Sequence, residues 1–178
     1  KLPVYTKTSD VFSSQTASGA KMKLDWKEIS LTKNIGTLRG TLFHEIVAQC
    51  SYPYQQEEIL SYANSYGYAL KDYDIKQILA LNSNALYASW MNEKHVFEQS
   101  YIIKEKKQVV HGFMDLVIYK EDEIIIIDFK TDATDNENKL IDMYAAQLQT
   151  YKHSMERITD LPIKTYIYAF SLFKCILL

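Results

Sequence analysis

The stretch VVHGFMDLVIYKEDEIIIIDFK, residues 109–130, decides the fold. Two segments rich in β-branched and aromatic residues, 109–119 and 123–130, indicate strands. The charged segment 120–123 is the only turn signal between them, so the pattern predicts a β-hairpin. The four isoleucines at 124–127 are typical of a strand that is buried on both faces. We therefore expect this hairpin to lie at the centre of a sheet.

The hairpin also brings charged residues together. If its turn centres on Glu121 and Asp122, Asp115 lies directly opposite Asp128. Opposed residues of an antiparallel pair point to the same face, with Cβ atoms about 5 Å apart. Lys130 comes two positions after Asp128 and shares that face. A bulge or another turn type would shift this register, and with it the predicted cluster.

Two carboxylates this close repel each other, and their burial costs free energy unless a cation or hydrogen bonds compensate. Paired carboxylate oxygens are the ligands that Mg²⁺ prefers. Lys130 could then orient an attacking water or offset charge on a phosphate. The alternative is a structural Asp–Lys pair on a solvated strand. The paired Asp115, following Gly112, favours the functional interpretation, because glycine leaves room for a ligand or a second backbone.

The rest of the sequence alternates helical and strand patterns, which predicts an α/β fold with a central mixed β-sheet flanked by helices. Either Asn136 or Asp135 should cap the last helix. Residues 1–37, rich in Ser, Thr and Lys, are expected to be a linker or lead-in, with a short amphipathic turn near Trp26–Ile29. The expected helices are 37–51, 55–66, 72–92 and 138–158, and the further strands are 96–103 and 163–170.

Composition narrows the class of protein. A length of 178 residues with 47% hydrophobic and 24% charged residues suits one globular domain. No apolar run is long enough to span a membrane, and the two cysteines form no CxxC pair, which excludes a four-cysteine cluster and favours a cytoplasmic setting. The net charge of −2 does not by itself indicate DNA binding. The chain opens with Lys1 and is expected to be a piece of a longer protein.

Four motifs in order carry a resemblance to a known family. Gly112–Asp115, Asp128–Thr131 and Gln147–Tyr151 resemble three successive motifs of the PD-(D/E)XK nuclease superfamily. Arg39–His44 resembles the Arg-Gly and helix-borne histidine of its RecB-type nuclease domains. The resemblance covers 38–170 and is nearest to the AddA-like branch, partly through the Asp-Phe-Lys-Thr-Asp run that ends at Asp132. It implies a restriction-endonuclease-like core.

The resemblance also implies a metal site. His44, Asp115 and Asp128 would be metal ligands, together with the backbone carbonyl of Phe129. The implied cofactor is Mg²⁺, and the imidazole ligand makes Mn²⁺ a possible substitute. Without the resemblance, His44 is more simply an ordinary, partly buried histidine.

Other residues receive roles in the same way. Lys130 would be the catalytic lysine, acting with Asp115 and Asp128, and Gln147 and Tyr151 would line the site from the following helix. Their i, i+4 spacing places these two on one helical face, although core packing explains Tyr151 equally well. Glu98 would support the site. Arg39 is expected either to contact a DNA phosphate or to face solvent.

The expected function is a Mg²⁺-dependent deoxyribonuclease, with exonuclease action favoured. Residues 38–178 would form the nuclease domain of a RecB/AddA-like helicase–nuclease in double-strand-break repair. Its partners would be DNA, a helicase region of the same longer chain and a second subunit, since no GxxxxGK[ST] motif is present here. The alternatives are a non-catalytic DNA-binding or scaffolding module with this fold, or a stand-alone phage or restriction-type nuclease.

Overall fold

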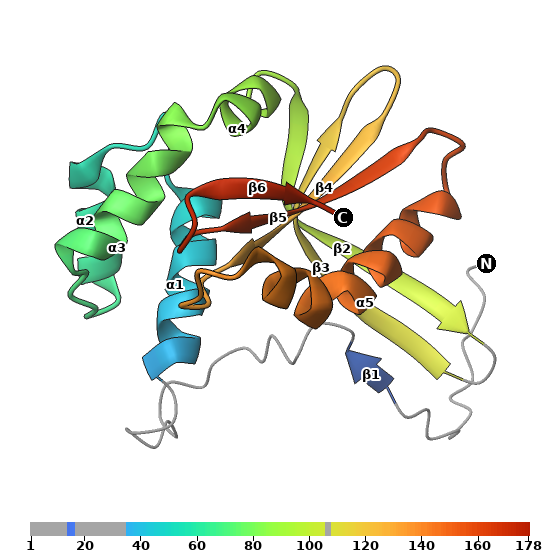
Figure 1. Cartoon of the computed structure of the whole chain (residues 1–178), viewed down its shortest axis with the longest axis horizontal. Coiled ribbons are helices and arrows are strands. Elements are labelled where there is room, and N and C mark those ends of the chain that lie inside the picture. Colours follow the sequence, from blue (N-terminus) through green and yellow to red (C-terminus); the bar gives the residue numbers. More distant parts are fainter. Residues whose placement is uncertain (1–13, 17–34, 106–107) are drawn as a thin grey trace, which may run out of the picture.

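The predicted architecture is confirmed. The computed structural model describes residues 14–16, 35–105 and 108–178, and within them helices cover both faces of a mixed six-stranded sheet (Figure 1). The order of elements is β1 (Ser14–Thr16), α1 (Ile35–Gln49), α2 (Gln56–Ser65), α3 (Asp72–Leu79), the 3₁₀ turn η1 (Ala80–Ser83), α4 (Ala85–Trp90), β2 (Lys94–Glu105), β3 (Gln108–Tyr119), β4 (Ile124–Lys130), α5 (Glu137–Glu156), β5 (Ile163–Ala169) and β6 (Lys174–Leu177).

The sheet is built around β3. Strand β2 pairs with β3 in antiparallel fashion along almost its whole length. On the other side of β3, β1 pairs in parallel with Val109–His111, and β4 pairs antiparallel with Leu116–Tyr119. Strand β5 then joins β4 in parallel and β6 closes the order. The interval 112–115 of β3 therefore lies between two successive partners, at a fork in the part of the sheet that the structure describes.

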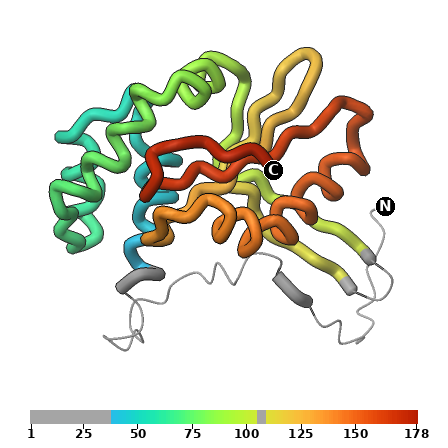
Figure 2. Tube along the Cα trace, viewed as in Figure 1, coloured from blue at the N-terminus to red at the C-terminus, as the bar shows by residue number. Residues whose placement is uncertain are grey.

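Two hydrophobic clusters lie on opposite faces of this sheet. Ile125 and Ile127 pack in a cluster with residues of α1 to α4, while Ile124 and Ile126 pack in a second cluster with α5. All four isoleucines are buried, so β4 is covered on both faces as the sequence predicts. The chain trace shows α5 and the α1–α4 group as separate layers (Figure 2).

Some boundaries differ from the sequence prediction. The single helix expected over 72–92 is wrong: η1 follows α3, and α4 starts anew after Asn84. The cause is local, because Asn84 has extended backbone angles and its side chain accepts a hydrogen bond from the amide of Tyr87, which caps α4. Asn136 caps α5 as one of the two expected residues. Strand β6 follows a residue with positive φ, Phe173, and was not predicted.

The predicted lead-in falls mostly outside the described residues, as does the amphipathic turn expected at Trp26–Ile29. Within it, Ser14–Thr16 form β1, and α1 begins at Ile35 rather than Thr37. Among the described residues, no helix combines the length and the apolar character needed to cross a bilayer.

Candidate metal and nuclease site

The hairpin register is confirmed, and it places the two aspartates at the fork. Leu116 pairs with Ile127, the last ladder pair of β3 and β4, and the same register continued by one residue sets Asp115 opposite Asp128. Beyond the last backbone pair, a side chain links the two strands, because Asp115 Oδ2 accepts a hydrogen bond from the amide of Phe129 at 2.8 Å. Asp115 and Asp128 are 3% and 1% exposed, so both carboxyl groups lie out of water.

The side chains of β3 change faces at this point. Met114 belongs to the cluster under α5, whereas Leu116, two positions later, belongs to the cluster under α1. Regular alternation would put both on one face. Glu98, which the β2–β3 register sets opposite Asp115, has a φ of 52°, a backbone conformation that side chains other than glycine rarely adopt. The interruption at Glu98 and Asp115 gives Asp115 neighbours from both layers.

Helix α1 supplies the histidine. His44 Nδ1 lies 3.2 Å from Asp115 Oδ1. Donor atoms of His44, Glu98 and Asp115 all lie within 4.8 Å of one another. Donors on an octahedral ion with bonds of about 2.1 Å lie about 3 to 4 Å apart, so a small closure brings these three around one cation. An imidazole nitrogen and two carboxylates suit Mg²⁺ or Mn²⁺.

The electrostatics of the site favour a bound cation. The pKa of the Asp128 carboxyl is raised to about 6, first by burial and second by the nearby charge of Asp115. The ammonium of Lys130, whose Nζ lies 2.6 Å from Asp128 Oδ2, acts in the opposite direction. Since the pKa of Asp128 stays raised, Lys130 offsets only part of the cost of ionising this carboxyl group.

The residues predicted on the last helix do meet the lysine. Lys130 Nζ donates a hydrogen bond to Gln147 Oε1 at 3.1 Å, and Gln147 Nε2 donates to the hydroxyl of Tyr151 at 2.7 Å. Tyr151 is 1% exposed and packs in the cluster under α5, so the core interpretation of this residue also holds. The functional roles of all these residues stay predictions.

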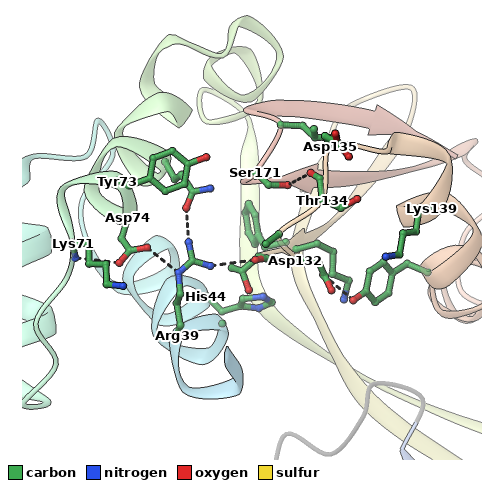
Figure 3. Close-up of a pocket in the computed structure, with 18 residues that line it drawn as sticks. Arg39, His44, Lys71, Tyr73, Asp74, Asp132, Thr134, Asp135, Lys139 and Ser171 are labelled. Carbon is green, nitrogen blue, oxygen red and sulfur yellow. Dashed lines mark hydrogen bonds and ion pairs between the residues drawn. The ribbon is translucent and has the colours of Figure 1, made fainter. Parts of the chain in front are cut away.

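Arg39 has protein partners on three sides. Its Nε donates to Asp74 Oδ1 at 2.8 Å, a terminal nitrogen donates to the carbonyl of Thr131 at 3.1 Å, and the other donates to Gln77. Its guanidinium also lies over the ring of Phe43. Figure 3 shows these contacts linking α1 with α3 and the segment after β4. Arg39 therefore joins structural elements, and its contact with DNA stays a prediction.

The two glycines beside the site serve close packing. A Cβ at Gly40 would lie 3.1 Å from Thr131 Oγ1, so glycine lets α1 approach the residue after Lys130. A Cβ at Gly112 would lie 2.9 Å from the hydroxyl of Tyr101. The space left by Gly112 is thus filled by a tyrosine of the neighbouring strand rather than by the ligand or second backbone considered from the sequence.

A pocket of about 1210 Å³ opens beside the site (Figure 3). Its walls come from α1, α3, the 131–135 loop and the start of α5. His44 and Lys130 lie on its lining, and so do Tyr144 and Asp132, which sequence reasoning did not include among the site residues. The only sequence signals for this pair were the position of Asp132 two residues after Lys130 and the helical spacing of Tyr144 from Gln147.

Several known proteins resemble part of this chain in sequence. The AddA component of the ATP-dependent helicase/nuclease of Syntrophomonas wolfei is 29% identical over 107 residues, which are 54% of this chain and 9% of that protein. The AddA proteins of Ligilactobacillus salivarius and Clostridium botulinum are 39% and 31% identical over 42% and 39% of this chain. In each of these two, the match spans 6% of the relative.

The family comparison covers far more of the chain. The model of the PD-(D/E)XK nuclease superfamily matches residues 19–171, which include all four motifs that carry the predicted resemblance. The resemblance to AddA-like helicase–nucleases is likewise confirmed by the names of the relatives. The chain therefore belongs to the PD-(D/E)XK nuclease superfamily.

Proposed function

We propose that this chain is a metal-dependent deoxyribonuclease that hydrolyses phosphodiester bonds. The observation that carries the proposal is the cluster of His44, Glu98 and Asp115 donor atoms within 4.8 Å, beside the Lys130–Asp128 pair. An imidazole, three acidic side chains and a lysine at one fork of the sheet are suited to hold a divalent cation next to a phosphate.

The residues that would hold the cation are His44, Glu98 and Asp115, with Asp128 and the carbonyl of Phe129 as the further ligands that the family resemblance implies. When bound, Mg²⁺ or Mn²⁺ would supply Lewis-acid activation of water and of the phosphate. The sequence analysis expected Glu98 only to support the site, and the proposal makes it a metal ligand.

The chain's own groups perform the remaining tasks. Lys130, 14% exposed in its side chain, lies on the pocket wall, where its ammonium can offset the charge that develops on the phosphate oxygens. Gln147 holds that ammonium from α5. The oxygen of water bonds to phosphorus and gives up one proton to solvent, while the bond from phosphorus to the leaving sugar oxygen breaks and that oxygen takes up a proton from solvent to leave as a hydroxyl.

The names of the relatives support a wider setting. We infer a nuclease module, residues 38–178 with a lead-in over 1–37, that works beside a helicase region and a second subunit on DNA in double-strand-break repair. Exonuclease action in the cytoplasm is the form expected from the sequence. The support is the similarity to AddA proteins, of which this chain matches 9% or less of the length.

A cleavage assay tests the proposal. The protein is incubated with single-stranded and duplex DNA in Mg²⁺ or Mn²⁺, with and without EDTA. We expect EDTA to abolish cleavage, and Asp128→Ala and Lys130→Ala to reduce it roughly a thousandfold while circular dichroism stays unchanged. His95→Ala, at a half-buried histidine on β2 that does not line the pocket, is the matched control.

Full activity in EDTA, or in Asp128→Ala, contradicts the mechanism. DNA binding without any cleavage in either metal supports the non-catalytic module instead.

A further inference from the structure

The ammonium of Lys130 is held from more than one direction. Nζ lies 2.6 Å from Asp128 Oδ2 and 3.1 Å from Gln147 Oε1. It also lies over the ring of Tyr144, 4.1 Å from the ring centroid. A cation at this distance from an aromatic face is attracted by the negative charge density of the ring, and more strongly where water is partly excluded.

Tyr144 is itself held in place by a hydrogen bond. Its hydroxyl donates to Asp132 Oδ2 at 2.9 Å. Burial, together with Asp132 as acceptor, raises the pKa of Tyr144 well above its usual value, so the phenol remains a neutral donor. Asp132 is two residues beyond Lys130, so the end of β4 and the first turns of α5 are linked twice, through the ammonium and through the phenol.

The ring opposes a strong competing attraction. The buried Asp128 carboxylate is the nearest charge to Lys130, and this contact alone favours an ammonium drawn into the sheet. Tyr144 and Lys130 both line the pocket, so the ring attracts the ammonium from the pocket side. Removing the ring while leaving Asp128 would let the lysine withdraw from the place where a phosphate is to be met.

We propose that Tyr144, anchored by Asp132, is a positioning residue for the ammonium of Lys130. The proposal rests on the nuclease function proposed above. It adds two residues to the reaction, neither of which touches the substrate. The alternative is that Tyr144 only packs against the cluster under α5, which it also borders.

Steady-state cleavage of a single-stranded oligonucleotide with Mn²⁺ separates the two. For Tyr144→Leu we expect kcat to fall roughly tenfold while KM stays within about twofold. Tyr144→Phe keeps the ring and should recover kcat to within about threefold of the wild type. The rise in melting temperature on adding Mn²⁺ should be the same in all three proteins, because the proposed metal ligands are unchanged.

A second pair of variants tests the anchor without changing the ring. Asp132→Asn retains an oxygen that accepts from the phenol and should keep kcat, whereas Asp132→Ala removes the same hydrogen bond as Tyr144→Phe and should lower kcat by a similar factor, about threefold. If Tyr144→Leu does not fold, this pair decides. Tyr66→Leu, at an exposed tyrosine after α2 and outside the pocket, is the matched control and should leave kcat unchanged.

The outcomes also distinguish this proposal from the function it rests on. A wild type without metal-dependent cleavage refutes the nuclease proposal. An active wild type whose Lys130→Ala variant is inactive, but whose Tyr144→Leu and Asp132→Ala variants retain wild-type kcat, refutes the positioning role alone. An equal loss in Tyr144→Phe and Tyr144→Leu also refutes it, since the ring would then contribute nothing.

Discussion

Two clusters of polar residues, each with a side chain from α1, differ in composition. In the first, Arg39 meets Asp74 and Gln77, which are 5% and 2% exposed, and one positive charge faces one negative charge. In the second, donor atoms of His44, Glu98 and Asp115 lie within 4.8 Å of one another, beside the buried Asp128 and the ammonium of Lys130.

The difference separates a structural cluster from a functional one. The Arg39 cluster satisfies its own groups and links α1, α3 and the segment after β4. The Asp115 cluster brings an imidazole and two carboxylates close enough to hold a divalent cation, and it also contains the positive φ of Glu98. The comparison leads to three expectations about stability.

The largest effect is expected from removing the positive charge of Arg39 from the first cluster. Arg39→Met leaves Asp74 buried without its cation, so the free energy of unfolding should fall by about 3 kcal/mol in urea denaturation. Lys174→Met, which removes an exposed partner of Glu137, is the control and should change it by less than about 1 kcal/mol.

Unchanged stability in Arg39→Met, combined with weaker DNA binding, would place Arg39 with the functional residues. The DNA-contact prediction made from the sequence would then be the better one.

A smaller effect on stability should follow from a change of pH, through the ionisation of Asp128 in the second cluster. The pKa of Asp128 is about 6 in the folded protein against an ordinary value of 3.8, so above pH 4 the unfolded chain releases this proton first. Stability from this group is present at low pH and is lost as the pH rises from about 4 through 6, by at most about 3 kcal/mol. Urea denaturation in EDTA measures this loss.

Asp128→Asn provides the matched reference, because it cannot titrate. We expect the wild type to lose stability relative to Asp128→Asn over this range, and the stabilisation by Mg²⁺ to grow as the carboxyl ionises. If the free energy of unfolding changes with pH in the same way in both proteins, the ionisation of Asp128 does not lower stability.

The smallest effect should come from the backbone of Glu98. Glu98→Gly relieves the positive φ, which should stabilise the metal-free protein by about 1 kcal/mol, while removal of the carboxylate weakens Mn²⁺ binding. Glu98→Gln separates the two contributions, since it keeps the strain and loses the charge. Calorimetry of unfolding and of Mn²⁺ binding measures both. Equal Mn²⁺ affinity in all three proteins would remove Glu98 from the ligand set.

The sequence predicted the parts of the molecule that depend on local pattern. The register of β3 and β4 followed from one charged turn and the alternation on either side of it, and this was enough to place Asp115 opposite Asp128. His44 is 71 positions before Asp115, and only the family resemblance brought them together. Spacing alone carries no information about contacts across such a distance.

Other features depend on tertiary contacts that leave little trace in the pattern. The change of faces on β3 at Asp115 lies opposite the positive φ of Glu98, and a glutamate in the sequence does not indicate a positive φ. The break after α3 depends on a side-chain cap at Asn84, within a stretch whose apolar spacing suits one long helix. Tyr144 fits the buried stripe of α5, so its contact with Lys130 could not be distinguished from ordinary packing.

The fork in the sheet has a mechanical consequence. Before Asp115, the first half of β3 pairs with β2 and β1 and forms an arm of the sheet that diverges from β4 (Figure 1). Asp115 lies at the base of this arm, and Asp128 lies on β4, which pairs with β5 at this position. A swing of the arm would therefore alter the spacing between the two carboxylates at the cost of the hydrogen bond from the Phe129 amide to Asp115 Oδ2, while the β3–β4 ladder stays intact. The width of the cation site is thus adjustable independently of the integrity of the sheet that carries it.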